Sequence, residues 1–425
     1  MKKFKIIIVI YFTQCLSLNA QITTSFYPVN KDVDQDSVYT EAGCVFNYYL
    51  GSNSINNHFV SDVYNSRFLD EYNKNSNYLK GKNILGSDLF IGAYVAVMPD
   101  SMLGSTNLGY RIGFGTRQFR SVRFSDDLYN LVFFGNKDYA GKTVNFDNTK
   151  FNLINFQELQ FGFFKDYHDN EINIRGYFGI NVLNGQQLQK LNVTKGSLYT
   201  ADDGEFLDLD TKFKYYSSDM SHKKFGDING MGLSCDAYLR IEDIKSKITF
   251  TFSSQDLGYI VWTKKSYEAS IDTTIHFDGV EVNNVLTLGQ SNLHGISKDS
   301  LMNILYSKND TNPIPISLPE RITLEVQKEW NGFIKTTLFG MNYIFDTGQP
   351  IPCFYFVQSF RLTQWLDGGV MANYGGFSRF NAGILFQYHS GKHFSAGLAS
   401  ANLSGFIIPA NAFARSIMVN ACYKF

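Results

Sequence analysis

A chain of 425 residues carries 38 basic and 39 acidic side chains, a formal net charge of -1, so we expect no nucleic-acid partner. Hydrophobic residues make up 44% of the chain and aromatic residues 16%, yet the mean hydropathy is only -0.17. Beyond residue 20 no stretch approaches the ~18 to 20 consecutive apolar residues of a transmembrane helix, which excludes a helical membrane protein. Strands that alternate apolar with polar residues explain this composition.

The first 20 residues have the layout of a secretory signal peptide. A lysine-rich start precedes an apolar stretch from Ile6 to Phe12, and Ala20 is the small residue expected before the cleavage site. We expect cleavage after Ala20, which leaves residues 21–425 as the mature chain. A membrane anchor is the alternative, because Leu18 is not the small residue usual two positions before the cut.

Alternation with a period of two recurs through the mature chain and predicts two-sided strands. From Glu171 to Leu183, apolar residues at even positions alternate with polar ones, and Gln157 to Lys165 is expected to pair with this strand as a hairpin. A soluble sandwich can alternate too, but several runs reach ~10 to 13 residues, the length of membrane-spanning strands. Candidate strands lie near residues 39–50, 87–98, 107–120, 129–135, 153–166, 171–183, 230–241, 246–254, 321–329, 332–346, 353–365, 366–375, 379–390, 393–403 and 412–425.

These features predict an all-β fold, an antiparallel transmembrane β-barrel that occupies residues 21–425 as one domain. Because such barrels favour even strand numbers, about 14 strands are expected, with 12 as the alternative. Three polar segments, 52–84, 186–228 and 263–318, are interpreted as long loops or a lumenal insert. The last of them contains a short helix candidate, Ser297 to Tyr306.

The C-terminal strand carries the most specific motif of the chain. Phe425 and Tyr423 are preceded at alternate positions by Ala421, Val419 and Ile417. This pattern resembles the final strand by which barrel-assembly machinery recognises outer-membrane proteins. We therefore predict that Tyr423 and Phe425 form an assembly signal, and an ordinary amphipathic final strand is the alternative.

Polar residues at the inward positions of the predicted strands are candidates for lining the lumen, because charges that face lipid are costly. A satisfied network that simply fills the barrel is an equal alternative. Trp262 follows a polar start and a glycine, which favours an interfacial anchor, and ligand stacking on Tyr259 or Trp262 is the alternative. The lumen-lining candidates are Asn173, Arg175, Asp236, Arg240, Arg361, Asn381 and Gln387.

Three short segments carry a family resemblance. They are Gln255 to Trp262 with its Asp-Leu-Gly-aromatic core, Ser317 to Arg321 with its Leu-Pro pair, and Asn402 to Phe406 before the last strand. From about residue 80 onward the chain resembles an uncharacterised family of Bacteroidota outer-membrane barrels, loosely related to fatty-acid-porin-like and type IX secretion-associated barrels. The resemblance implies a barrel in the cell outer membrane and supplies no catalytic residues.

The sequence contains no H-E-x-x-H, G-x-S-x-G or Walker motif, so we expect no enzyme, cofactor or metal site. The leading hypothesis is a passive pore or carrier for a small solute, which could be hydrophobic, with residues 263–318 as a lumenal constriction or gate. The alternative is a non-conducting scaffold that partners a secretion or surface-attachment apparatus, and a surface enzyme is the weakest candidate. An open lumen favours the pore, whereas a lumen filled by side chains, with structured outer loops, favours the scaffold.

Overall fold

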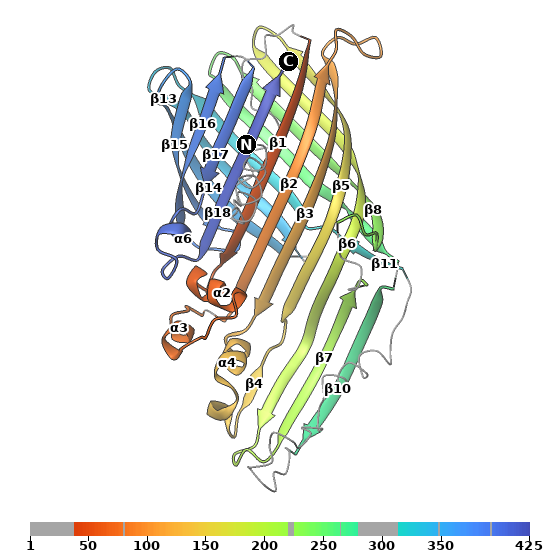
Figure 1. Ribbon diagram of the computed structural model, residues 1–425, viewed down its shortest axis with the longest axis vertical. Coiled ribbons are helices and arrows are strands. Elements are labelled where there is room, and N and C mark those ends of the chain that lie inside the picture. Colours follow the sequence, from red (N-terminus) through yellow and green to blue (C-terminus); the bar gives the residue numbers. More distant parts are fainter. Residues whose placement is uncertain are drawn as a thin grey trace, which may run out of the picture.

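The computed structural model describes residues 38–79, 81–219, 225–263, 265–278, 313–346, 349–391 and 393–425. Fourteen antiparallel strands form a closed barrel, in which each strand pairs with the next and the last pairs with the first (Figure 1). Around the ring these strands are β1 (Tyr39–Ser52), β2 (Asn83–Met98), β3 (Leu108–Phe124), β5 (Lys150–His168), β6 (Ile172–Thr200), β8 (Gly230–Asp243), β9 (Ile248–Trp262), β12 (Glu320–Glu329), β13 (Ile334–Asp346), β14 (Gln349–Arg361), β15 (Leu366–Gly375), β16 (Asn381–Ser390), β17 (Phe394–Ser400) and β18 (Ala414–Lys424). The predicted antiparallel barrel of about 14 strands is confirmed. The predicted signal peptide lies outside the described residues.

The two ends of the barrel differ. Short connections such as residues 169–171 and 244–247 lie at the end that carries the C-terminus, which we name the turn end (Figure 1). Helices lie at the opposite end, which we name the loop end. The helical segments are α2 (Asn57–Tyr64), α3 (Glu71–Asn75), α4 (Asp126–Phe134), the 3-10 helix Lys137–Tyr139 and α6 (Ser404–Ile407). Among the described residues, no helix is long and apolar enough to cross a membrane.

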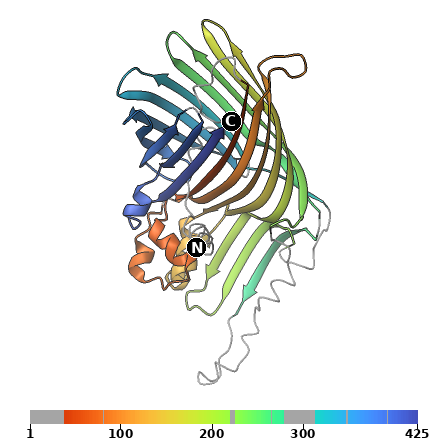
Figure 2. The ribbon, with the colours of Figure 1, turned by 45° about the horizontal axis from the view of Figure 1, so that its top comes forward.

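Four further strands extend the sheet. They are β4 (Thr143–Asn145), β7 (Leu207–Ser217), β10 (Tyr267–Phe277) and β11 (Ile314–Ser317). β6 has 29 residues, and beyond the barrel it pairs with β7, which pairs in turn with β10. Figure 2 shows this sheet, in green, continuing past the barrel on one side. The expectation of a loop over 186–228 is therefore wrong where β6 and β7 form a hairpin.

The segment 263–318, expected as a lumenal insert, belongs to the sheet wherever it is described. β10 pairs with β7 outside the barrel, and β11 pairs with β9 in line with β12. The described parts of this segment thus extend the wall. The helix candidate at 297–306 lies outside the described residues.

Alternation along the strands separates a lipid side from a lumen side, as predicted. On β6, Phe178 and Ile180 are 54% and 51% exposed, whereas their neighbours Tyr177 and Asn181 are buried. In a membrane the exposed apolar side chains contact hydrocarbon, and the buried set faces the interior. The barrel interior is therefore built from the polar half of each strand together with large aromatic residues.

One predicted strand, 129–135, is a helix instead. Ser125 accepts a hydrogen bond from the backbone N–H of Leu128 and so caps α4, and two acidic residues occupy the first helical turn. Gly135 ends the helix with a φ of 84°. Apolar side chains of α4 pack against α2 around Phe59 and Tyr129, so local capping and this packing outweigh the β propensity of the segment.

A β-bulge interrupts β9 where it faces β8. Cys235 is opposite Leu257, but Ala237 is opposite Ser254, so β9 contains one extra residue, and Asp256 adopts a left-handed φ of 60°. The extra residue shifts the alternation, and Trp262 consequently points inward with no exposed surface. The predicted interfacial anchor at Trp262 is therefore wrong, because a one-residue shift exchanges the two faces of a strand.

Gly258, two residues after the bulge, has no room for a side chain. A Cβ atom there would lie 2.2 Å from the carbonyl oxygen of Leu233 and 2.5 Å from the Cα of Ser234. Gly258→Ala is expected to destabilise the barrel by about 1–3 kcal/mol, because the clashing atoms belong to backbone. Gly176→Ala is the matched control, since nothing lies within 4 Å of its added Cβ. Equal unfolding free energies of the two variants in denaturant titrations would contradict the expected clash.

Candidate functional site

The lumen is layered, and the order of residues along β3 defines the layers. From the turn end to the loop end, the inward side chains include Arg117, then Phe119, then Ser121, all of them buried. On β5 the inward side chains over the same interval are Glu158, then Phe156 and Ile154, then Asn152. Both strands therefore pass through a charged layer, an apolar layer and a polar rim.

The charged layer is centred on four buried side chains that we name the latch: Asp88, Arg117, Asp256 and Arg321. The guanidinium of Arg117 holds both carboxylate oxygens of Asp88 at 3.0 and 2.8 Å and also forms an ion pair with Asp256. Arg321 donates a third hydrogen bond to Asp88. Each of the four side chains is at most 6% exposed, so the two acids and two bases neutralise one another away from bulk water.

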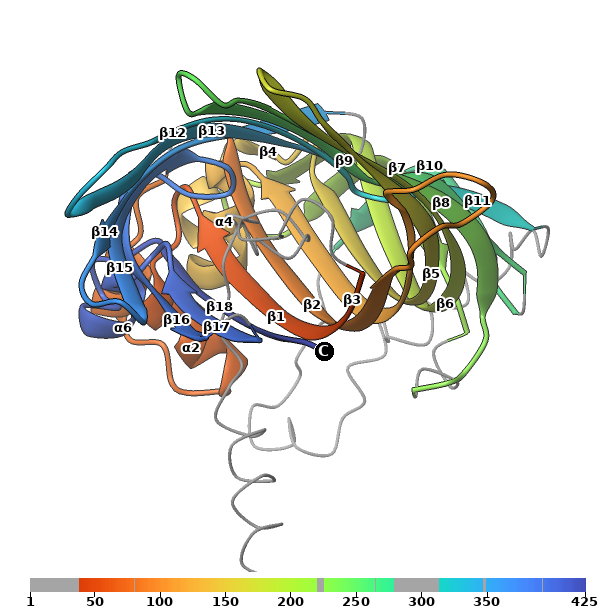
Figure 3. The same cartoon turned by 90° about the horizontal axis from the view of Figure 1, so that it is seen from above.

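The latch spans the lumen. Its residues come from β2 and β3 on one side and from β9 and β12 on the other, and these two pairs of strands are not neighbours in the sheet. Viewed from above, β12 and β13 lie across from β1, β2 and β3 (Figure 3). At the polar rim, Asp346 on β13 makes a similar connection, because it accepts hydrogen bonds from Ser121 and from Asn152. Opposite walls of the barrel are thus tied by charges and hydrogen bonds.

Two further carboxylates border the latch. Asp236 accepts the backbone N–H of Asp256 at 2.9 Å and the amide of Asn181 at 2.9 Å, and Glu158 accepts the amide of Gln160 at 2.8 Å. The free volume among these side chains is about 20 Å³, roughly the room needed for one water molecule. Within the described part of the chain, no group of three or more His, Cys, Asp and Glu side chains is placed to hold a metal.

The apolar layer adjoins the latch on the side of the loop end. The ring of Phe377, from the segment between β15 and β16, lies 6.2 Å from that of Tyr49 and 6.0 Å from that of Phe119. Gly86 gives this ring space, because a Cβ there would lie 2.4 Å from it. The apolar layer is formed by Tyr49, Phe119, Ile154, Phe156, Leu183, Leu188, Ile260, Trp262, Ile314, Ile316, Leu318, Ile344, Ile351, Phe377 and Ala414. Lumenal residues of membrane barrels are usually polar, so such a layer needs a functional or structural reason.

The seven predicted lumen-lining residues lie on the inward side of their strands. They are Asn173, Arg175, Asp236, Arg240, Arg361, Asn381 and Gln387, which alternate with the outward apolar side chains. Asp236 alone borders the latch. Arg175 pairs with Asp166 on the neighbouring strand β5 at 2.7 Å, and Asn381 bonds to Ser378 beside its own strand. Their part in a pathway stays a prediction.

Sequence analysis missed the latch itself. Arg321 occupies an inward position on a strand whose outward residues from Ile322 to Val326 are apolar, which is a detectable signal. Around Arg117 the outward residues Gln118 and Arg120 are polar, which obscures the alternation. The pairings of Arg117 and Arg321 across the lumen were not detectable, because 139 residues separate Arg117 from Asp256 and 233 separate Asp88 from Arg321. The phase shift at the bulge also concealed the inward direction of Asp256.

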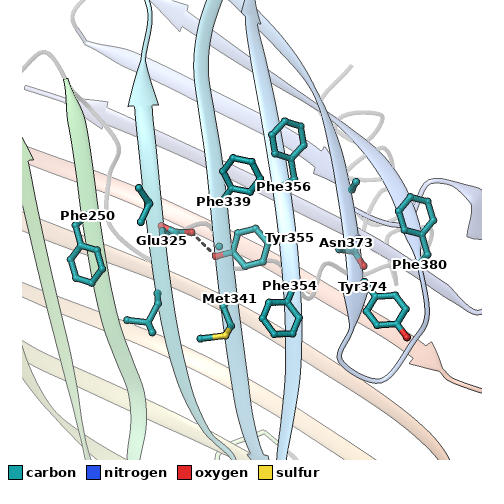
Figure 4. A pocket seen from close by; sticks show the side chains of 14 residues that line it. Phe250, Glu325, Phe339, Met341, Phe354, Tyr355, Phe356, Asn373, Tyr374 and Phe380 are labelled. Carbon is teal, nitrogen blue, oxygen red and sulfur yellow. Dashed lines mark hydrogen bonds between the residues drawn. The ribbon is translucent and has the colours of Figure 1, made fainter. Parts of the chain in front are cut away.

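A second hollow lies on the outer wall over β9 and β12 to β15 (Figure 4). It has a volume of about 450 Å³, and aromatic side chains such as Phe339 and Phe354 border it, exposed by 62% and 51%. Glu325 and Tyr355 lie behind it on the lumen side, joined by a hydrogen bond of 2.7 Å. The groove faces hydrocarbon, so lipid chains are its natural contacts, and the lumen remains the candidate site.

The sheet beyond the barrel carries a row of exposed ion pairs on one face. Lys212 pairs with Asp272 at 2.6 Å across β7 and β10, and His276 bonds to Asp208 on β7 and to Asp278. Exposed pairs of this kind each contribute little to stability. They add to the backbone pairing of β10 with β7 a small electrostatic contribution that responds to salt and pH.

The carboxylates of Asp208 and Asp278, which accept its hydrogen bonds, raise the pKa of His276. A raised pKa means that the protonated ring stabilises the β7 and β10 pairing below about pH 6.5, and that this contribution is lost as pH rises through the raised value. Amide hydrogen exchange of β10, corrected for its intrinsic pH dependence, is expected to be slower below about pH 6.5 than above the raised pKa of His276. Asp208→Asn should reduce that difference, and an unchanged profile would count against the interaction.

A family model described as "Family of unknown function (DUF5723)" matches residues 44–394. The chain belongs to the DUF5723 family. The expected membership in a family of unknown function is thereby confirmed, and the segments 255–262 and 317–321 lie within the matched residues, whereas 402–406 lies beyond them.

No curated protein matches this DUF5723 chain. Among solved structures, the toluene transporter TodX of Pseudomonas putida is 8% identical, with 92% of this chain and 89% of that chain covered and a TM-score of 0.38. The toluene transporter TbuX of Ralstonia pickettii is 8% identical, with 91% of this chain and 89% of that chain covered and a TM-score of 0.42. The translocator domain of the autotransporter NalP from Neisseria meningitidis is 9% identical, with 93% of this chain and 92% of that chain covered and a TM-score of 0.36. Values of this size say nothing about what the DUF5723 barrel binds or carries.

Proposed function

We propose that this protein is an outer-membrane barrel that lets a small hydrophobic solute pass, and that its lumen is closed at rest. The apolar layer is the observation that carries the proposal. A constriction lined by side chains such as Phe119, Phe156 and Trp262 repels water and ions, whereas apolar solutes gain free energy by leaving water there. A pore for polar solutes would have a polar lining at its narrowest level.

Closure at rest follows from the contacts across the lumen. The latch and the rim bonds of Asp346 join opposite walls, so a solute passes only when these side chains rearrange. This constriction belongs to the barrel wall and includes Ile314, Ile316 and Leu318, which lie at the end of the segment 263–318 in which a gate was expected. The proposal includes the assembly signal at Tyr423 and Phe425 and requires no catalytic step.

The proposal is tested by uptake of the apolar dye N-phenyl-1-naphthylamine into Gram-negative cells that express the full chain. Uptake faster than in cells with an empty vector, together with little ionic conductance of the purified protein in planar bilayers, is the expected result. Heat-modifiable migration on gels verifies that the barrel is folded. Dye uptake equal to the vector control by cells that display the folded barrel would contradict the proposal.

A scaffold is the second candidate function, and the filled lumen together with the projecting sheet favours it. Strands β6, β7 and β10 present a row of ion pairs beyond the barrel, where a secretion or surface-attachment protein could bind. Deletion of residues 194–212 together with 267–277 removes this projection and leaves the barrel strands. Loss of a co-purifying outer-membrane partner, with dye uptake unchanged, would favour the scaffold.

A further inference from the structure

Two of the three ion pairs of the latch connect walls that share no backbone hydrogen bonds. Arg117 on β3 reaches Asp256 on β9, with β5, β6 and β8 between them around the ring. Asp88 on β2 reaches Arg321 on β12, and β3, β5, β6, β8 and β9 lie between these two strands around the ring. Because the sheet is hydrogen-bonded without either pair, both can separate while every strand stays paired. We propose that the latch is the gate of the solute route, an inference that rests on the proposed function.

The bulge in β9 places a hinge beside the latch. Asp256 itself has the left-handed φ of 60°, and the adjoining strand is broken at the same level, where β11 ends at Ser317 and β12 begins at Glu320. One backbone hydrogen bond of 3.0 Å, from Leu318 to Gly258, joins the two irregular stretches. Bulges commonly lie next to functional sites, where they redirect a side chain. Here the redirected side chain is the carboxylate that Arg117 holds.

The stretch on the loop side of this hinge carries part of the apolar layer. Ile260 and Trp262 follow the bulge on β9, Ile316 precedes the break on the adjoining strand, and Leu318 lies within it. On its other side this part of β9 pairs with residues 230–235 of β8. Release of Asp256 from Arg117 therefore frees the two stretches to swing outward about that pairing, with the irregular junction as the flexible link to the rest of the wall. The latch thereby controls the adjoining apolar constriction.

Charge balance supplies the closing force. The two acids alternate with the two arginines in the order Asp256, Arg117, Asp88, Arg321, so each contact in the chain joins opposite charges. Neutralising both acids leaves two arginines that repel across the lumen, and the remaining carboxylates, Glu158 and Asp236, border Arg117 on its own side without bridging to Arg321. Loss of the acids thus changes an attraction between the walls into a repulsion.

The test compares Asp88→Asn/Asp256→Asn with Asp166→Asn. Asp166 also forms an inward ion pair with an arginine, but its partner Arg175 is on the adjacent strand, so this pair does not join opposite walls. We expect the double variant to take up N-phenyl-1-naphthylamine about tenfold faster than wild type, and Asp166→Asn to match wild type. The single variant Asp256→Asn keeps Asp88 between the arginines and should give about a threefold increase. Asp256→Asn replaces the double variant in the comparison if the double variant does not show heat-modifiable migration.

Potassium chloride conductance in planar bilayers separates failure of the latch from failure of the proposed function. If wild type takes up dye above the vector control but the latch variants do not differ from it, the latch is rejected and the solute route stands. If wild type takes up no dye, while the latch variants alone open potassium currents and Asp166→Asn does not, the latch ties the walls and the solute route is rejected. Equal behaviour of latch variants and Asp166→Asn in both assays rejects the latch.

Discussion

Replacement of Arg117 by methionine is expected to lower the free energy of unfolding by about 3–5 kcal/mol, because it leaves Asp256 buried without a cation and Asp88 with one arginine instead of two. Denaturant unfolding in phospholipid micelles, followed by tryptophan fluorescence, measures the change. Methionine keeps most of the volume of the arginine stem, so the loss is electrostatic and not a cavity effect.

Lys212→Met provides the control for that measurement. Lys212 also forms an ion pair with an aspartate, Asp272, but the two side chains are 57% and 65% exposed. Its removal is expected to cost at most about 1 kcal/mol. Similar losses for Arg117→Met and Lys212→Met would mean that water reaches the latch and that its charges are not buried.

The energetics of buried charges also bear on why the latch exists. Replacing a whole buried cluster of ion pairs by apolar residues of similar volume is often neutral or stabilising, by about 1–4 kcal/mol. A barrel selected only for stability would therefore gain nothing from Asp88, Arg117, Asp256 and Arg321. Charges that tie two walls reversibly fit a lumen that must open better than one that must only stay filled.

Strand alternation made most of the barrel predictable from sequence. Outward residues such as Phe178 and Ile180, and inward ones such as Arg175, could be assigned because a period of two is a local property of the chain. The closed ring was also foreseeable, since the last strand has the alternation that pairs it with β1. The exceptions are local conflicts. The residues of α4 have strand propensity but are capped as a helix, and polar residues after 186 hid strands that continue the sheet beyond the barrel.

The functional site was far less accessible to sequence analysis. The latch depends on which strands face each other across the barrel, and neither the spacing nor the periodicity of the residues encodes that arrangement. Asp256 and Trp262 show the second obstacle, because a single extra residue in β9 exchanged their faces. The segment that contains both was recognised as a family feature, but its mechanical role as a bulge emerged only from its partners in space.

Phe377→Ala is expected to widen the constriction and to lower the free energy of unfolding by about 3–5 kcal/mol, because the ring is fully buried against Tyr49 and Phe119. The same change at Phe339, which is 62% exposed on the lipid side, is the matched control and should have a smaller effect. Dye uptake by the two variants distinguishes the solute route from the scaffold, the two functions that the filled lumen permits. Faster uptake by Phe377→Ala alone identifies the apolar layer as the barrier to the solute, whereas lower stability without faster uptake identifies the layer as packing and favours the scaffold.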